Sequence, residues 1–189
     1  MSKHKLVAIC GSLRSGSFNA KLLKLAVGEA ERLGAEVDTV DLKALAIPVY
    51  DGDIEHESGP PPSVVELKDR IRAAAGLLIA SPEYNHSIPG GLKNAIDWAS
   101  RAPSPPFRNK VAALMGSSPG PVGTARGQYH LRQTLNSVGL WVVPSQMLVP
   151  HQAQAFDEQG TLKDPTKVKE LNDLVAHLTV ELDLRSRPL

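Results

Sequence analysis

The sequence contains a single cysteine, Cys10, among its 189 residues. A disulfide within the chain is therefore impossible, and a thiolate-rich metal site is disfavoured. No apolar run approaches the length that a membrane-spanning helix needs, and the first run, residues 6–10, is too short for the core of a signal peptide. These absences lead us to expect a cytoplasmic protein that does not associate with a membrane.

Charge of either sign is not in excess, because 21 lysine and arginine residues balance 20 aspartate and glutamate residues to a net charge of +1. A field of one sign attracts nucleic acid or an anionic membrane, so the sequence predicts neither partner. The six histidines lack the spacing of metal ligands, and we expect no metal site. A chain of this length with 42% hydrophobic residues can bury one core, which favours a single domain over residues 1–189.

The sequence does contain a regular alternation of short apolar runs and helical patterns. Residues 6–10 form a continuous apolar run, as in a strand that is buried on both faces of a parallel sheet. Helical spacing follows over residues 22–33, with Gly34 placed to end the helix. Further strands are expected over residues 36–42, 76–80, 111–115 and 140–149, the last interrupted at Pro144, and further helices over 64–75, 92–99, 124–138 and 165–182.

Five strands that alternate with helices predict an α/β fold, a three-layer α/β/α sandwich around a five-stranded parallel sheet. Because crossovers are right-handed, few strand orders remain, and the flavodoxin-like order 2-1-3-4-5 is one of them. Residues 51–62 are acidic and then proline-rich, and we expect them to form an extended surface loop. The start of this segment resembles a calcium loop, but His56 stands where such a loop needs glycine.

The first predicted strand runs into a polar segment, Gly11–Asn19, with the sequence GSLRSGSFN. Glycines let the backbone approach a ligand closely, and the segment leads into a helix N-terminus, where free N–H groups and the helix dipole favour an anion. Hydroxyl groups, an amide and the guanidinium of Arg14 add donors, so we expect a phosphate monoester here. The alternative is that Ser17 and Asn19 merely cap the helix while the glycines shape a turn.

The same residues exclude three better-known phosphate motifs. A Walker loop needs lysine and then serine or threonine after its second glycine, but Gly16 is followed by Ser17 and Phe18. The dinucleotide fingerprint needs a glycine where Leu13 stands. A cysteine phosphatase loop needs an arginine six residues after Cys10, where Gly16 stands. Cys10 is therefore expected to be a buried strand residue.

Two further loops carry a resemblance to a known family. Residues 81–98 read SPEYNHSIPGGLKNAIDW, and residues 116–133 read GSSPGPVGTARGQYHLRQ. Together with the first loop, these motifs resemble the NADPH-dependent FMN reductase family, and in particular its bacterial soluble quinone and chromate reductases. The resemblance covers nearly the whole chain, and the first two motifs are highly specific when they occur together.

The resemblance implies a bound FMN and the residues that hold it. The first loop would hold the phosphate, the second would run along the isoalloxazine, and the third would border the ring and the ribityl chain. Arg101, which follows the helix near residue 99, would line the acceptor pocket, either across a subunit contact or by folding back. Its alternative role is to favour the dipole of that helix from the last turn. The implied cofactor-binding residues are Ser12, Arg14, Ser15, Gly16, Ser17, Phe18 and Asn19 in the first loop, Pro82, Glu83, Tyr84 and Asn85 in the second, and Ser117 and Gly120 in the third.

The implied activity is electron transfer from NADPH or NADH through FMN to small acceptors. A ping-pong mechanism is expected, with quinones, nitro or azo compounds, chromate or ferric complexes as acceptors. Glu83 is not expected to act as a general acid, because hydride transfer to a flavin does not demand one, and its alternative role is that of a solvated loop carboxylate. A homodimer or homotetramer is expected, with residues 90–101 in or near a subunit contact and Trp98 in the core or in that contact.

Three other functions stay open at this point. A flavodoxin-type electron carrier docks large partners, usually through an acidic surface, and a reductase of free flavin uses FMN as a substrate. The net charge of +1 and the presence of a single nearby tyrosine, Tyr84, argue against the carrier. A redox-sensing protein that FMN stabilises is the third alternative, since one fold hosts many functions.

Overall fold

The computed structural model describes residues 4–186 of the chain as alternating strands and helices. The strands are β1 (Lys5–Cys10), β2 (Glu36–Val40), β3 (Gly76–Ala80), β4 (Val111–Ser117) and β5 (Trp141–Val149). The helices are α1 (Phe18–Arg32), α2 (Leu42–Leu45), α3 (Gly52–Ser58), α4 (Pro62–Ala73), α5 (Gly90–Ala99), α6 (Ala125–Ser137), α7 (Gln152–Ala155) and α8 (Pro165–Arg185).

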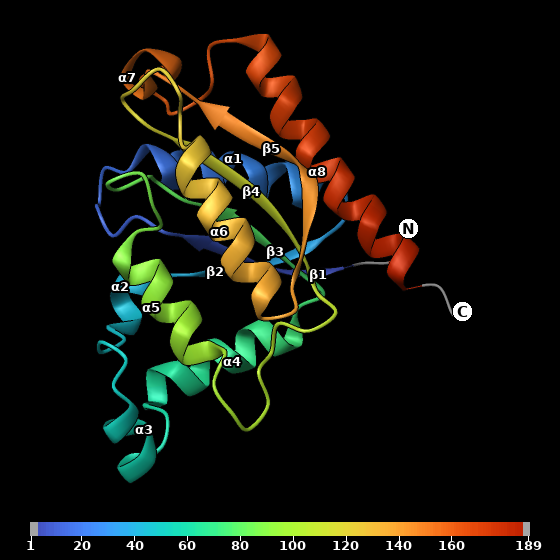
Figure 1. Ribbon diagram of the computed structural model, residues 1–189. Helices are drawn as coiled ribbons and strands as arrows, with labels where there is room; N and C mark the ends of the chain where they lie inside the picture. The colour runs from blue at the N-terminus through green and yellow to red at the C-terminus, as the bar shows by residue number, and fades with distance from the viewer. Residues whose placement is uncertain (1–3, 187–189) are drawn as a thin grey trace.

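The five strands are all parallel and pair in the order β2-β1-β3-β4-β5 (Figure 1). The predicted five-stranded sheet and its strand order are therefore confirmed. In the register of the sheet, Val7 of β1 lies between Asp38 of β2 and Leu77 of β3. A strand in this inner position is covered on both faces, which explains why the sequence of β1 is continuously apolar.

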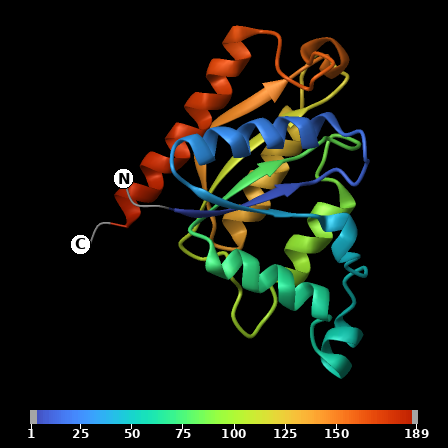
Figure 2. The same cartoon turned by 180° about the vertical axis from the view of Figure 1, so that it is seen from behind.

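Helices cover both faces of the sheet and complete the predicted three-layer sandwich (Figures 1 and 2). On one face, Ala8 of β1 and Leu78 of β3 pack in one cluster with apolar side chains of α1 and α8. On the other face, Ile9 of β1 and Ile79 of β3 pack with side chains of α4, α5 and α6. Successive strand residues thus point to opposite faces, and each face has its own hydrophobic core.

The helix ends that the sequence predicts are confirmed by backbone geometry. Gly34 follows α1 with a φ of 92°, and Gly139 follows α6 with a φ of 86°, values that glycine adopts without the penalty of a Cβ atom. Asp164 precedes α8 and accepts a hydrogen bond from the backbone N–H of Thr166, with Pro165 in the first helical turn.

The segment 51–62 does not form the extended loop that we expected, because residues 52–58 form α3. The side chain of Asp51 caps this helix by accepting from the N–H of Asp53, and acidic side chains in the first turn favour the helix dipole. Gly59, with a φ of 72°, ends it. The capping pattern was present in the sequence, but the glycine and prolines around it also fit a loop.

Strand β5 continues through Pro144, where we expected an interruption. Its pairing with β4 shifts register between Ala112 and Leu114, and the strand resumes regular pairing at Gln146. Strand β5 lies at the edge of the sheet, where a residue without an N–H group leaves no neighbour unpaired. The proline therefore distorts the ladder without ending the strand.

The two ends of the described chain meet at the amino end of β1. The His4 ring nitrogen Nε2 lies 2.7 Å from Oδ1 of Asp183 in α8. Figure 1 shows both termini on the side of the sheet away from the loops that follow the strands. Among residues 4–186, no helix is long and apolar enough to cross a membrane.

Candidate functional site

Three loops gather where β1, β3 and β4 end, and we call them together the cradle. Loop 1 comprises residues 11–17, loop 2 residues 81–89 and loop 3 residues 118–124, directly after Ser117. Loops 1 and 2 are in contact where they begin, because the N–H of Gly11 donates to the carbonyl of Ala80 at 2.8 Å. Parallel strands end at the same edge of a sheet, and that edge is where ligands bind in open α/β folds.

Loop 1 offers hydrogen-bond donors that the described chain does not use. The N–H groups of Leu13, Ser15 and Gly16 make no hydrogen bond to any of residues 4–186. The side chain of Arg14 is exposed beside them. Ser17 caps α1 by accepting from the N–H of Ala20 at 3.4 Å, as the alternative interpretation of this residue held. Free N–H groups, a guanidinium and a helix N-terminus fit a phosphate group.

Asn19 ties loop 1 to the end of β4. Its Nδ2 donates to the carbonyl of Ser117 at 3.0 Å, and its Oδ1 accepts from the N–H of Ser117 at 2.8 Å. Both residues are buried, with exposed fractions of 3% for Asn19 and 1% for Ser117. Because both the nitrogen and the oxygen of the Asn19 amide bond to the backbone of Ser117, this residue holds two walls of the cradle at a fixed separation.

Phe18, the first residue of α1, also connects loop 1 to a distant segment. Its ring lies 5.5 Å from the ring of Phe156, measured between centroids, and the Lys21 ammonium lies 4.9 Å from the Phe18 centroid. Phe156 is 3% exposed and belongs to the core under α8. The pair anchors the start of α1 to the segment that follows α7.

Loop 2 contains a tight turn from Tyr84 to Ser87. The N–H of each of these two residues donates to the carbonyl of the other, at 3.1 and 3.0 Å. Asn85 and His86 stand between them with φ values of 50° and 63°, as a turn with two left-handed residues requires. The turn leaves the N–H of Asn85 without a partner among the described residues and exposes 47% of Tyr84.

Glu83 joins loop 2 to the helix that follows loop 3. Its Oε2 accepts from the N–H of Gly127, in the first turn of α6, at 2.8 Å, and its side chain is 10% exposed. His86 lies 3.3 Å from its other oxygen. Glu83 is therefore not a solvated loop carboxylate, which was the alternative interpretation of this residue. A glycine at position 127 permits this approach, because a Cβ there would contact Glu83 and the carbonyl of Ser87.

Loop 3 is stabilised by Ser118, His151 and Gln152, which the sequence analysis did not single out. The hydroxyl of Ser118 donates to the carbonyl of Gly123 at 2.6 Å, and the hydroxyl of Ser117 lies 3.3 Å from Oε1 of Gln152 in α7. The carbonyl of Gly120 accepts from the N–H of His151 at 3.2 Å. Loop 3 thus packs against the short helix α7 and the residue before it. Four residues are too few to show helical periodicity, so the sequence did not predict α7.

Cys10, the last residue of β1, is half-buried, where we expected a buried strand residue. Burial raises the pKa of its thiol, and hydrogen bonds from the Ser12 backbone and the Ser17 side chain oppose that shift. A thiol with a raised pKa is a poor nucleophile at neutral pH. No group of three or more His, Cys, Asp or Glu side chains that could hold a metal ion occurs within residues 4–186.

Arg101 does not reach the cradle of its own chain. It follows the far end of α5, and the ten residues of this helix span about 15 Å. Its Nε donates to Oε2 of Glu55 at 3.1 Å, and its guanidinium lies 5.3 Å from the ring centroid of Tyr50. Within one chain, Glu55 and Tyr50 hold Arg101 beside α3 and away from the cradle. Its place at the acceptor side across a subunit contact stays a prediction.

Trp98 is a core residue. It is fully buried, its Nε1 donates to the carbonyl of Pro48 at 2.9 Å, and its ring packs edge-on against Tyr50 at 4.9 Å between centroids. The helix α5 does bury two sides, as expected, but it buries Ile96 and Trp98 inside one chain. These apolar residues thus give no support to a subunit contact, and the oligomeric state stays a prediction.

Comparisons with known proteins agree with one another. The sequence model of the NADPH-dependent FMN reductase family matches residues 4–154. The chain is 48% identical over 170 residues to an NAD(P)H-dependent FMN reductase of Pseudomonas aeruginosa, with 88% of each chain covered. It is 46% identical over 134 residues to a quinone reductase of Escherichia coli K12, with 70% of each chain covered.

A solved structure shows the same similarity over the full fold. FerB, a flavoenzyme NAD(P)H:(acceptor) oxidoreductase from Paracoccus denitrificans, superposes with a TM-score of 0.85 at 33% sequence identity, over 96% of this chain and 98% of that one. FMN and NAD(P)H are the flavin and the electron donor of the family that these comparisons define. With the cradle at the carboxyl ends of its strands, the chain belongs to the NADPH-dependent FMN reductase family.

Proposed function

We propose that the chain binds FMN in the cradle and transfers electrons from NADPH or NADH to quinones and other small acceptors. One observation carries the proposal. Hydrogen bonds of the buried Asn19 and the partly buried Glu83 tie together the segments that carry the three loops, and three N–H groups of loop 1 that have no partner among residues 4–186 lie beside Arg14. This arrangement suits a ligand with a phosphate at one end and a ring at the other. It also keeps that ligand's position fixed, which is the main contribution of a protein to flavin chemistry.

Each loop has a task in this proposal. The N–H groups of Leu13, Ser15 and Gly16 and the guanidinium of Arg14 bind the phosphate. The unpaired N–H of Asn85 donates to the pyrimidine edge of the ring and stabilises negative charge there. The exposed ring of Tyr84 forms a wall, with Pro82 behind it and Gly120 on the side of loop 3. Bound FMN supplies the group that accepts and returns a hydride.

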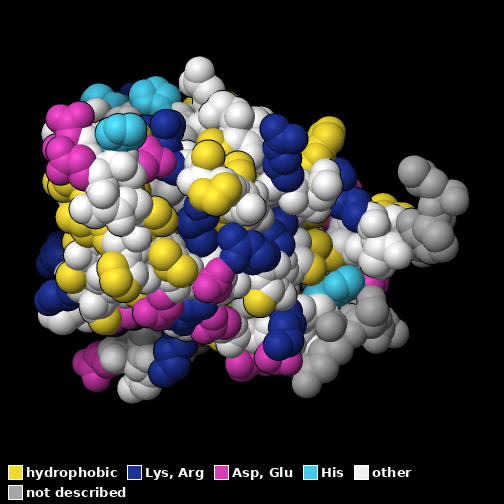
Figure 3. All heavy atoms as spheres, turned by 90° about the horizontal axis from the view of Figure 1, so that it is seen from below, with side chains coloured by type: hydrophobic (Ala, Val, Ile, Leu, Met, Phe, Trp, Pro, Cys, Tyr) yellow, Lys and Arg dark blue, Asp and Glu magenta, His cyan; other side chains and the backbone are white. Residues whose placement is uncertain are grey.

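Donor and acceptor use the same exposed side of the ring in turn, which makes the mechanism ping-pong. The acceptors proposed are quinones first, as in the named reductases that the chain resembles, and then nitro or azo compounds, chromate and ferric complexes. The balanced charge of the chain, +1 overall, does not favour a protein partner that docks through an acidic surface. On the underside shown in Figure 3, basic and acidic side chains are interspersed.

We propose further that the protein works in the cytoplasm as a homodimer or homotetramer. Loop 2 and α6 contact each other through Ser87 and His130, 3.0 Å apart, and both present exposed aromatic rings, Tyr84 at 47% and Tyr129 at 65%. Exposed aromatics close to a site are typical of subunit contacts. Sedimentation that finds a monomer at micromolar concentration would contradict this part of the proposal.

The visible spectrum of the FMN-loaded protein under anaerobic conditions tests the function. We expect NADPH or NADH alone to bleach the flavin absorbance, and a soluble quinone added afterwards to restore it. An electron carrier would not be bleached without another protein, and that outcome would overturn the proposal. A reductase of free flavin would lose its FMN on gel filtration, whereas we expect the flavin to elute with the protein.

A further inference from the structure

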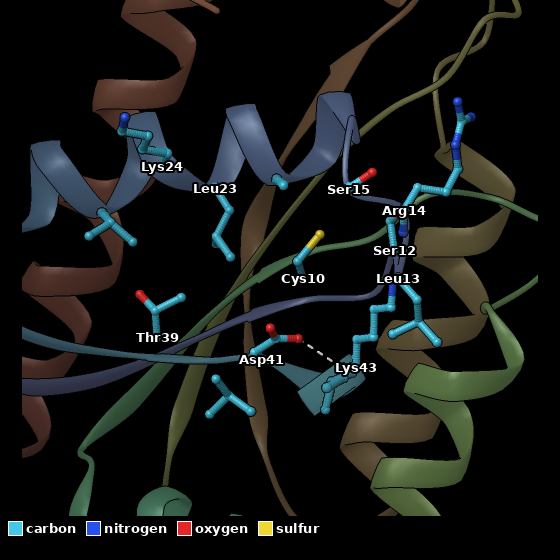
Figure 4. A pocket seen from close by; sticks show the side chains of 14 residues that line it. Cys10, Ser12, Leu13, Arg14, Ser15, Leu23, Lys24, Thr39, Asp41 and Lys43 are labelled. Atoms are coloured by element: carbon cyan, nitrogen blue, oxygen red, sulfur yellow. Dashed lines mark hydrogen bonds between the residues drawn. The ribbon is translucent and has the colours of Figure 1, made fainter. Parts of the chain in front are cut away.

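A cavity with a volume of about 460 Å³ lies beside the cradle. Loop 1, α1, the carboxyl end of β2 and the start of α2 line it (Figure 4). Loops 2 and 3 do not, because β2 and β3 flank β1 on opposite sides. Its volume falls within the range of small-molecule sites, about 300–1,000 Å³. The cavity is therefore separate from the cradle and shares one wall with it, loop 1.

The walls of this cavity are largely apolar. Leu23 and Val27 of α1 lie on one side with Cys10 of β1, and Thr39 and the backbone after it lie on the other. The side chains of Val40 and Leu42 pack in the core on the opposite face of the sheet. In Figure 4 the side chains of Leu23 and Cys10 point into the space between α1 and β2, whereas the guanidinium of Arg14 points away from it. An apolar slot between a helix and a strand edge accommodates a flat ring better than it accommodates a highly charged ligand.

Asp41 gives the cavity a single acidic group. It caps α2, and its Oδ1 accepts both N–H groups that the cap uses, from Lys43 at 2.8 Å and from Ala44 at 3.2 Å. None of residues 4–186 makes a hydrogen bond to its Oδ2. The carboxylate points into the cavity in Figure 4. Helix capping accounts for one oxygen, and the second is available to hydroxyl groups of a ligand.

We infer that this cavity binds the adenosine half of NADH, with Asp41 accepting hydrogen bonds from the ribose hydroxyls. In dinucleotide-binding α/β domains, an acidic residue near the end of the second strand has this role, and Asp41 directly follows β2. The inference rests on the proposed function, which supplies the donor. The dinucleotide crosses loop 1, so its adenine lies in the slot and its nicotinamide lies over the cradle.

Two variants remove the site without touching the cradle. Asp41→Asn keeps a capping acceptor, because asparagine caps helices as well as aspartate does, but it removes the charged acceptor for the ribose. Thr39→Trp places a large ring into the cavity from the exposed edge strand β2, where an aromatic residue is tolerated. Thr39→Val is the matched control, since it changes the side chain without filling the cavity.

Steady-state kinetics with a truncated donor test the inference. Reduced nicotinamide mononucleotide carries the same hydride as NADH and NADPH but lacks adenosine. We expect Asp41→Asn to raise the KM for NADH about ten- to a hundredfold, the cost of losing a charged hydrogen bond, with kcat retained. Thr39→Trp should raise the same KM at least as much, because it fills the cavity. The KM for the truncated donor should stay as in the wild type. Equal effects on both donors, or equal KM values of the two donors in the wild type, would overturn the inference.

Calorimetry with ADP-ribose separates this inference from the proposed function. ADP-ribose carries the adenosine half without the nicotinamide, and we expect it to bind the FMN-loaded wild type and the Thr39→Val variant but not Thr39→Trp. Binding without any reduction of the flavin would support the cavity and contradict the function. Reduction of the flavin without ADP-ribose binding would support the function and contradict the cavity.

Discussion

In the cradle, the hydrogen bonds between Asn19 and Ser117 are buried and join two loops, whereas around Arg101 the charged groups lie together on the surface beside α3. Asn19 and Ser117 are almost fully buried, but the side chain of Arg101 is 49% exposed. A buried group that loses its partner cannot turn to water, while an exposed charge can. The two regions should therefore respond very differently to single substitutions.

Gly116→Ala should have the largest effect. A Cβ at this position in β4 would overlap Oγ1 of Thr124 and the carbonyl oxygen of Ser81, and neither the backbone nor a buried threonine can move aside cheaply. We expect a loss of about 3 kcal/mol or more in the free energy of unfolding, measured by urea denaturation. The control is Gly28→Ala in α1, where a Cβ meets nothing within 4 Å and a gain of about 0.5–1 kcal/mol is expected. Equal responses of the two variants would contradict the close approach of β4 and loop 2.

Asn19→Ala should follow. The substitution leaves the buried N–H and carbonyl of Ser117 without their partner, and unsatisfied groups of this kind cost about 1–3 kcal/mol each. We expect a loss of about 2–4 kcal/mol in urea denaturation, together with weaker FMN binding because loops 1 and 3 separate. Asn136→Ala, on the exposed side of α6, is the matched control and should change neither quantity. A loss of less than about 1 kcal/mol in Asn19→Ala would mean that the positions of loops 1 and 3 do not depend on the hydrogen bonds between Asn19 and Ser117.

Glu83→Ala should have an intermediate effect. The substitution removes the acceptor for the N–H of Gly127 and leaves the first turn of α6 without its cap, which costs about 0.5–2 kcal/mol. Glu83→Gln keeps an acceptor oxygen and should recover most of the loss, which thermal unfolding of both variants can measure. If the two variants are equally destabilised, the negative charge matters and not the hydrogen bond.

Arg101→Ala should have the smallest effect on stability, and the effect should depend on pH. The pKa of Glu55 is held below its ordinary value, first because the Tyr50 hydroxyl donates to it and then because Arg101 pairs with it. Such a carboxylate contributes stability that is present above its unfolded-state pKa and is lost as the pH falls through its folded-state pKa. We expect Arg101→Ala to begin acid unfolding at a slightly higher pH, and Tyr50→Phe to shift the onset further. Coincident acid transitions for all three proteins would contradict this account of Glu55.

The sequence predicts the fold well and the connections within the site less well. Buried parallel strands produce continuous apolar runs, and Gly34 and Asp164 mark helix ends through local chemistry. The sequence alone therefore predicts these features. The helix α3 was missed because its cap lies among residues that also fit a loop. The family resemblance located the three loops, but it could not show which side chains hold them together.

Those side-chain contacts depend on long-range geometry. The bond between Asn19 and Ser117 joins residues 98 positions apart, and no local pattern encodes it. The contact of Arg101 with Glu55 could not be predicted for the same reason, since Glu55 lies in the segment that was expected to be an extended loop. The cavity beside Asp41 could not be predicted either, because the sequence of a capping aspartate after a strand does not depend on whether a cavity lies next to it.

The FMN dissociation constant, measured side by side for the wild type, Arg14→Ala and Arg101→Ala, tests the central claim most directly. If the cradle binds FMN through loop 1, Arg14→Ala removes a charged hydrogen bond to the phosphate and should weaken binding about ten- to a hundredfold. Arg101→Ala should leave the constant unchanged, because Arg101 lies at the far end of α5. Unchanged affinity in Arg14→Ala, or a comparable loss in both variants, would contradict the assignment of the phosphate to loop 1.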